Sequence, residues 1–253
     1  MIDGEKLKKL LGIFDVAVVV KPTTHSTNTD GKSLAKAGIN KPVLIVADEQ
    51  TGGRGRQEKT FLSPAGGLYM TLVLPLAAPI GDAVMATSCS SVAVSRALGK
   101  SGIDCGIKWV NDIYAGGKKL CGILAEAEND YLTMTTHALI IGIGVNVESS
   151  PSLDGDVKAV SLRELGCSAD ITDICAAIAE EMLVLYNDGF DFSTYRDEYV
   201  RRSVVLGREI TFTENGVTRH GTALGIGDRG ELIVGCGGET FALTSGEISV
   251  RTL

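Results

Sequence analysis

Apolar runs and helical spacings in the first part of the chain predict strands that alternate with helices. β-branched and aliphatic runs at residues 16–20, 43–47 and 68–74 are typical of short buried strands, and we expect the first run to stop at Pro22. Between the first two runs, small hydroxyl side chains precede a segment that we expect to be helical from residue 28 to about residue 37.

The middle of the chain combines one helical segment with a group of strands. Small and apolar residues recur at helical spacing from Asp82 to about Leu98. The pattern that follows predicts successive strands of an antiparallel or mixed sheet. We expect these strands at residues 105–109, 112–115, 120–127, 132–136 and 138–145.

The last third contains two helices and then a run of short β-rich pieces. Apolar residues share one face of a predicted helix at 170–187, and a second helix is expected at 193–202. Beyond Val204, Asn-Gly, Asp-Arg-Gly and Gly-Gly turn signals separate closely spaced strands, which is typical of a small SH3-like β-barrel. We therefore expect an α/β (α+β) fold in two parts, residues 1–203 and residues 204–253.

Composition excludes several classes of protein. The 253 residues are 44% hydrophobic and 22% charged, with no apolar stretch near the ~20 residues of a membrane span and no signal peptide, so we expect a cytoplasmic protein. Six scattered Cys without a C-x-x-C pair indicate buried free thiols, and three unclustered His make a zinc site improbable. A net charge of −7 disfavours nucleic-acid binding.

A loop rich in glycine and arginine carries the first chemical signal. Residues 52–56 read Gly-Gly-Arg-Gly-Arg and follow the strand expected at 43–47. Such a loop alone is more often solvent-facing than functional. Its three glycines would nevertheless let backbone amides and the guanidinium groups of Arg54 and Arg56 converge on a phosphate.

Three further segments carry candidate polar groups. Residues 108–112 read Lys-Trp-Val-Asn-Asp, and Lys119 follows a Gly-Gly turn where it could point into a cleft, whereas Lys118 is expected in solvent. Residues 142–146 read Gly-Ile-Gly-Val-Asn and lack the third glycine of a dinucleotide fingerprint, so we interpret them as a strand whose small residues admit a ligand. Each segment has a purely structural alternative, a turn or a buried strand.

The order of these segments is more specific than any one of them. Ser-Thr-Asn at 26–28, the loop at 50–56, Lys-Trp-x-Asn-Asp at 108–112 and a final segment at 245–251 together resemble the biotin protein ligases. The resemblance covers about residues 18–251. It implies a mixed-sheet catalytic domain of the biotin/lipoate ligase type with an SH3-like C-terminal domain. The early first strand leaves no room for a winged helix, which implies the form without repressor activity.

The resemblance also implies an activity. Biotin and ATP would give biotinyl-5′-AMP, which is then transferred to a lysine of a biotin carboxyl carrier protein of a carboxylase. The substrates and cofactors would be biotin, ATP and Mg²⁺. No nucleic acid or membrane partner is expected, and both a monomer and a homodimer remain open.

The site residues implied by this resemblance fall into three groups. The biotin-binding residues would be Ser26, Thr27, Asn28, Gln50, Arg54, Gly55, Arg56, Lys119 and Gly122. The ATP-binding residues would be Phe61, Asn111, Asn146 and Arg251. The catalytic residues would be Lys119, Arg54, Arg56, Asp112 and Lys108, with Asp112 either binding Mg²⁺ or accepting a proton from the incoming lysine.

The chain departs from the family pattern at two places. Val110 stands where the family usually has Pro, which changes a backbone constraint and removes no chemical group. Glu58, Lys59 and Phe61 stand where the family commonly has Gly, Arg and Trp. Phe61 keeps an aromatic face for packing on the adenylate, while the added acid at residue 58 could reshape loop closure.

Two other functions share parts of this pattern. A lipoate ligase or octanoyltransferase would have the same catalytic fold, although the loop at 50–56 and the C-terminal tail favour biotin. A non-catalytic biotin-binding protein would bind biotin without labelling a carrier. The presence of Lys119 together with Arg54 and Arg56 favours the catalytic alternative.

Overall fold

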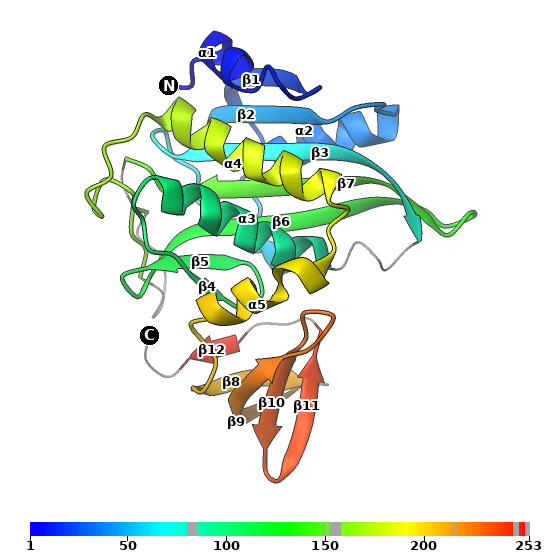
Figure 1. Ribbon diagram of the computed structural model, residues 1–253, viewed down its shortest axis with the longest axis vertical. Coiled ribbons are helices and arrows are strands. Elements are labelled where there is room, and N and C mark those ends of the chain that lie inside the picture. The colour runs from blue at the N-terminus through cyan, green and yellow to red at the C-terminus, as the bar shows by residue number, and fades with distance from the viewer. Residues whose placement is uncertain (80–84, 149, 152–157, 215, 245–247, 251–253) are drawn as a thin grey trace.

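A computed structural model describes residues 1–79, 85–148, 150–151, 158–214, 216–244 and 248–250, with a large sheet above a smaller one (Figure 1). Within these residues the large sheet has seven strands in the order β1-β2-β3-β7-β6-β5-β4, and only the β1–β2 pair is parallel. Its strands are β1 (Ala17–Thr24), β2 (Val43–Gln50), β3 (Leu68–Pro79), β4 (Gly106–Lys108), β5 (Asp112–Ala115), β6 (Lys118–Asp130) and β7 (Thr135–Val145).

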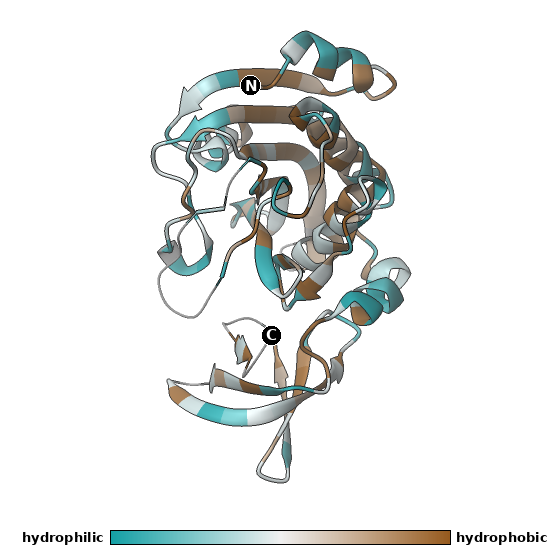
Figure 2. Ribbon diagram, turned by 90° about the vertical axis from the view of Figure 1, so that its left-hand side faces the viewer, coloured by the Kyte–Doolittle hydropathy of each residue, from teal (hydrophilic) through white to brown (hydrophobic). Residues whose placement is uncertain are grey.

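Helices cover both faces of the large sheet. The helices are α1 (Gly4–Leu10), α2 (Thr27–Ala37), α3 (Ala86–Lys100), α4 (Ile171–Asn187) and α5 (Phe192–Arg202). Helices α3 and α4 pack side by side on one face, and α2 lies on the other (Figure 1). In Figure 2 the hydrophobic colour is concentrated in the sheet and in the helices beside it. No helix among the described residues is both long and apolar enough to span a bilayer.

Strand alternation divides the sheet into two unequal cores. On β7, Leu139, Ile141 and Ile143 join the large core beneath α3 and α4. The intervening Ile140 joins a small core beneath α2, which also contains Ala35, Ile45 and Val73. Because successive side chains of a strand point to opposite faces, Gly142 and Gly144 lie on the α2 face. Helix α2 covers one part of that face, and the rest is available for a cavity.

The C-terminal part forms its own antiparallel sheet. Its strands are β8 (Glu209–Glu214), β9 (Val217–Ile226), β10 (Leu232–Cys236), β11 (Glu239–Leu243) and β12 (Ile248–Val250). Their order is β11-β10-β9-β8-β12, as expected for a small barrel-like domain joined through tight turns. The fold class expected from the sequence is therefore confirmed.

Two expectations about the strands are wrong: where the first strand ends, and whether residues 132–136 form a strand of their own. Strand β1 does not stop at Pro22 but continues to Thr24, which is possible because β1 is an edge strand and proline needs no ladder partner on its open side. The strand expected at 132–136 does not exist as a separate element. Residues 131–134 instead turn between β6 and β7, with the Asp130 carboxylate accepting from the backbone N–H of Leu132 at 2.8 Å. The expected start of α3, at 82–84, lies outside the described residues.

The β9–β10 turn fixes the C-terminal sheet on the N-terminal part of the chain. The Trp109 indole N–H donates to the carbonyl of Gly230 at 2.9 Å, which satisfies a donor that is costly to bury unpaired. The guanidinium of Arg196, on α5, donates to the carbonyl of Ile226 at 2.7 Å and to that of Gly227 at 3.4 Å. These contacts bring β12 to the edge of the site described below.

Replacing Arg196 with Ala is expected to lower the free energy of unfolding by about 1.5 kcal/mol, because charge-assisted bonds to two carbonyls are lost. Urea unfolding measures the change. Arg201→Ala on the same helix is the control, since that side chain is 70% exposed and its loss should cost less than about 0.5 kcal/mol. Equal stability of the two variants would contradict this account of the interface.

Candidate active site

A cavity of about 600 Å³ opens on the α2 face of the large sheet. Its walls come from the N-terminus of α2, the end of β2, the loop at 54–62, the 108–112 segment and strands β6 and β7. Ile248 and Ser249 of β12 also line it, so the C-terminal sheet contributes to its rim. The cavity is large enough for a small ligand together with a nucleotide fragment.

Three glycines form the floor of this cavity. A Cβ at Gly144 would overlap the ring of Phe61, and a Cβ at Gly122 would lie 3.0 Å from the same ring. A Cβ at Gly142 would overlap the side-chain oxygen of Asn28. The bare backbone of β6 and β7 therefore lets Phe61 and Asn28 lie close to the sheet, where larger residues would push them into the cavity.

The loop over the floor is held by its own backbone. The N–H of Gly55 donates to the carbonyl of Lys59 at 2.7 Å, and the N–H of Phe61 donates to the carbonyl of Gly53 at 3.0 Å. A single 3₁₀ turn (Arg56–Glu58) lies between them, with Gln57 at φ 53°. A Cβ at Gly53 would overlap the Phe61 carbonyl and the Ser63 hydroxyl, which explains why glycine stands there.

One end of the cavity is polar and mostly uncharged. The Thr27 N–H donates to Gln50 Oε1 at 2.8 Å, and Gln50 Nε2 donates to Ser63 Oγ at 2.8 Å. The Thr71 hydroxyl lies 2.7 Å from Asn28 Oδ1 and 2.8 Å from Thr27 Oγ1. Ser26, Thr27 and Asn28 are all buried. Hydrogen-bonding groups held in this way suit a compact polar ligand group that carries both donors and acceptors.

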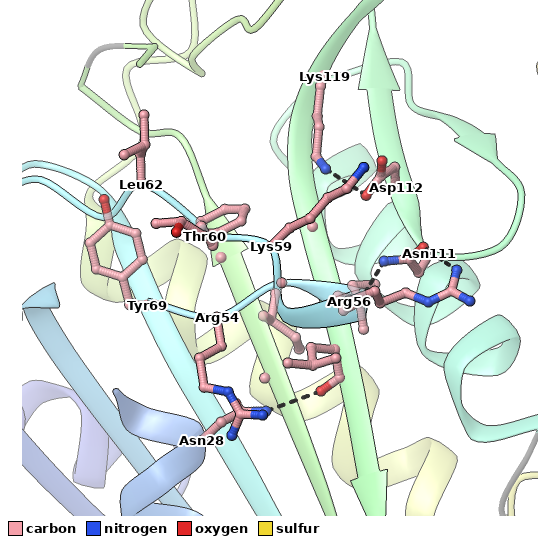
Figure 3. A pocket seen from close by; sticks show the side chains of 18 of the residues that line it. Asn28, Arg54, Arg56, Lys59, Thr60, Leu62, Tyr69, Asn111, Asp112 and Lys119 are labelled. Carbon is pink, nitrogen blue, oxygen red and sulfur yellow. Dashed lines mark hydrogen bonds and ion pairs between the residues drawn. The ribbon is translucent and has the colours of Figure 1, made fainter. Parts of the chain in front are cut away.

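The opposite end is charged. Lys119 Nζ lies 2.8 Å from the Asp112 carboxylate, and the Arg56 guanidinium donates to Asn111 Oδ1 at 3.2 Å. Lys108 Nζ lies 5.7 Å from the centre of the Tyr114 ring. In Figure 3, Lys119 and Asp112 point toward one another, and Arg56 points toward Asn111. Cations at this end can attract an anionic ligand group.

The 108–112 segment is anchored from several sides. Asn111 Nδ2 donates to the carbonyl of Ile123 at 2.7 Å, and the Ile123 N–H donates back to the carbonyl of Asn111 at 3.1 Å. The hydroxyl of Tyr199, on α5, donates to the Val110 carbonyl at 3.2 Å. The Trp109–Val110 peptide bond is cis. Lys108 and Asp112 therefore project from a backbone that is tied to β6 and α5.

Burial keeps the aromatic hydroxyls of the cavity protonated. Desolvation, with a smaller effect of the Asp112 charge, raises the pKa of Tyr114 to about 12. Desolvation also raises the pKa of Tyr69, whose hydroxyl donates to the carbonyl of Pro64 at 2.7 Å. Both phenols are therefore neutral hydrogen-bonding groups near neutral pH.

The cavity brings most of the expected site residues together. Its lining includes Ser26, Thr27, Asn28, Gln50, Arg54, Gly55, Arg56, Phe61, Lys108, Asn111, Asp112, Lys119 and Gly122. Asn146 is not among the lining residues, because its amide donates to the carbonyls of Val160 at 3.1 Å and Lys119 at 3.4 Å. Its expected contact with adenine stays a prediction, and Arg251 lies outside the described residues.

Other residues of the site were not identified from the sequence. Ser63 and Thr71 complete the polar end, Tyr114 lines the charged end, and Glu126 lies behind Asn28 and Arg54. A usable signal existed only for Glu126. It follows Gly122 and Leu124 at the strand period of two, so it shares the face that carries the cavity.

Metal-binding groups are sparse here. Within the described ranges no group of three or more His, Cys, Asp or Glu could hold a metal ion. Asp112 is the one carboxylate among the described lining residues. This donor set is compatible with Mg²⁺ carried mainly by ligand phosphates, because Mg²⁺ often uses only one or two protein carboxylates in such sites.

Comparison with known families assigns both parts of the chain. The model of the Biotin/lipoate A/B protein ligase family matches residues 19–146. The model of the Biotin protein ligase C terminal domain matches residues 205–251.

Individual relatives agree with these matches. A biotin–acetyl-CoA-carboxylase ligase of Paracoccus denitrificans is 33% identical over 83% of this chain and 91% of the relative. A bifunctional ligase/repressor BirA of Bacillus spizizenii is 32% identical over 86% of this chain and 69% of the relative. The structure of a biotin protein ligase from Aquifex aeolicus in complex with biotin and ATP has a TM-score of 0.72 at 25% identity, and covers 94% of this chain and 99% of that chain.

The glycine floor generates a stability prediction. Gly142→Ala should lower the free energy of unfolding by about 1–3 kcal/mol, because the added methyl overlaps the buried Asn28 side chain. Gly99→Ala, where a Cβ meets nothing within 4 Å near the end of α3, should leave stability equal or raise it by up to about 1 kcal/mol. Urea unfolding of both variants measures these changes. A Gly142→Ala protein as stable as the native one would contradict the close approach of the Asn28 side chain to the Gly142 backbone.

Proposed function

The chain belongs to the biotin/lipoate A/B protein ligase family, and we propose that it is an ATP-dependent biotin protein ligase. It activates biotin as biotinyl-5′-AMP and transfers the biotinyl group to a lysine of a biotin carboxyl carrier protein. The observation that carries the proposal is a single cavity with a neutral polar end and a cationic end. Relatives named as biotin ligases match across both parts of the chain, which supports the choice within the family.

The division of the cavity suits biotin in one orientation. Biotin has a ureido ring at one end and a carboxylate at the other. The ring would lie at Thr27, Asn28 and Gln50, since its donors and acceptors are costly to bury without partners. The carboxylate would then point toward Lys119 and meet the α-phosphate of ATP there.

Charge stabilisation is the main catalytic contribution that we assign to the protein. A biotin carboxylate oxygen attacks the α-phosphorus, and the bond to the departing pyrophosphate breaks. Both reactants are anionic, so a cation held between them lowers their repulsion and stabilises the charge of the transition state. We assign this role to Lys119, with Arg56 and Lys108 beside it. Mg²⁺ carried by ATP, with Asp112 as a ligand, would neutralise further phosphate charge.

The second step needs protection of the adenylate and entry of the carrier lysine. The loop at 54–62 would exclude water, with the Phe61 ring against the glycine floor in the position where we expect packing on the adenylate. The lysine amine then attacks the acyl carbon, and AMP leaves. Asp112 is the one carboxylate among the described lining residues, so it is our candidate to accept the amine proton when its pairing with Lys119 is exchanged.

We also propose the division of the chain into residues 1–203 and 204–253. Two separate sheets and the break between α5 and β8 support it. The net charge of −7 supports the absence of a nucleic-acid partner.

The function is tested by incubating the protein with ATP and Mg²⁺ plus biotin or lipoate, and by measuring pyrophosphate release. We expect release with biotin and not with lipoate. Release with lipoate alone would assign the chain to the lipoate branch of the fold. Addition of a carrier domain then separates a ligase, which labels the lysine, from a protein that only binds biotin.

Lys119→Ala is expected to lower the rate of biotin-dependent pyrophosphate release by about 10²–10³-fold, because the cation next to the reacting groups is lost. Lys118→Ala is the matched control, since the preceding lysine is exposed and should change the rate by less than about twofold. Near-native turnover by the Lys119 variant would remove this residue from the catalytic role.

A further inference from the structure

Glu126 joins three elements around the polar end of the cavity. Its carboxylate accepts from Asn28 Nδ2 at 3.1 Å and lies 2.6 Å from Lys32 Nζ, so it holds two residues of α2. It also lies 3.5 Å from a guanidinium nitrogen of Arg54, in the loop over the cavity. The Glu126 side chain is only 18% exposed, so these charges are partly shielded from water.

The carboxylate fixes the direction of a hydrogen-bond chain. A carboxylate can only accept, so Asn28 turns its NH₂ group toward Glu126, with a longer bond to the Leu124 carbonyl at 3.4 Å, and its Oδ1 toward Thr71. The Thr71 hydroxyl donates to Asn28 Oδ1 at 2.7 Å and lies 2.8 Å from Thr27 Oγ1, while the Thr27 hydroxyl donates to Gln50 Oε1 at 3.1 Å. The orientation of the Asn28 amide, and with it the acceptor that Asn28 presents to a ligand, therefore depends on a group outside the cavity lining.

The two arginines of the loop have different partners, and only Arg54 is paired with Glu126. In Figure 3, Arg54 points toward Asn28, while Arg56 points toward Asn111 at the opposite end. The Arg54 charge is thus balanced by Glu126, whereas Arg56 lies next to the Lys119–Asp112 pair. A balanced Arg54 at the polar end does not attract the ligand carboxylate away from Lys119.

We propose that Glu126 is a positioning residue that orients the biotin ring by fixing Asn28 and that anchors the loop through Arg54. The inference rests on the proposed function for the identity of the ligand. It also assigns Arg54 to loop anchoring rather than to phosphate stabilisation. Glu126 acts through its neighbours and touches neither phosphate nor the reacting atoms.

Glu126→Gln tests the proposal, because the amide keeps the shape, removes the charge and can present a donor to Asn28. We expect the Kd for biotin, measured by calorimetry without ATP, to rise about tenfold. The kcat of pyrophosphate release at saturating biotin should stay within about twofold. The lost contact stabilises bound biotin equally before and during the reaction, and the charged end of the cavity is intact. Trypsin should cleave the ligand-free protein after Arg54 about threefold faster, because its anchor is gone.

Glu128→Gln is the matched control. It removes the same charge two residues further along the same face of β6, and no ion pair of Glu128 occurs among the described residues. It should leave all three readouts unchanged. If Glu126→Gln fails to fold, Glu126→Asp keeps the charge with a shorter reach and should show the same pattern at a smaller size.

An unchanged Kd for biotin in a folded Glu126 variant overturns the proposal, and so does a fall in kcat without a change in Kd. Equal effects of the Glu126 and Glu128 variants also overturn it. If the native protein neither binds nor activates biotin, the proposed function fails instead. The trypsin readout still tests the Glu126–Arg54 link in that case, so the two failures are distinguishable.

Discussion

The absence of side chains on one face of two central strands is the constraint on which the site depends. Gly122, Gly142 and Gly144 lie on the same face of β6 and β7, and a Cβ at any of them would meet Asn28 or Phe61. The same strands present Ile123, Ile141 and Ile143 to the large core on the opposite face. The sheet can therefore support a cavity on one side without losing the apolar packing that stabilises it on the other.

The second organising feature is the separation of charge along this floor. Polar groups of α2 and β2 gather at one end, and Lys119, Asp112 and Arg56 gather at the other. Backbone position decides at which end each group lies: the N-terminus of α2 follows edge strand β1, whereas Lys119 is the second residue of β6, beside β5. A ligand with a neutral polar ring and a carboxylate fits this arrangement in one direction only. Orientation is thus built into the fold before any ligand is bound.

Features with a strong local cause could be predicted from the sequence. The apolar runs of β2 and β7 and the periodicity of α4 are repeated signals, so these elements were placed within a few residues. The end of the first strand was wrongly predicted at Pro22, because a single sequence does not reveal which strand will lie at the edge of a sheet. The turn at 131–134 was missed because Tyr131, Leu132 and Met134 are apolar, although all three are exposed in the hairpin. Asn146 and Glu126 show how far the residues of the site can be predicted from the sequence. Whether such a side chain enters a cavity or supports it from behind depends on partners that are distant in sequence.

The direction of the ligand in the cavity is the central claim, and a crystal structure of the protein with biotin and ATP tests it most directly. We predict the ureido ring within hydrogen-bond distance of Thr27, Asn28 and Gln50, with the acyl–phosphate link beside Lys119. Phe61 should pack against the adenylate, and Arg54 should still contact Glu126. A ligand bound in the reverse direction, or phosphate oxygens bound by Arg54 in place of Lys119, would contradict the account.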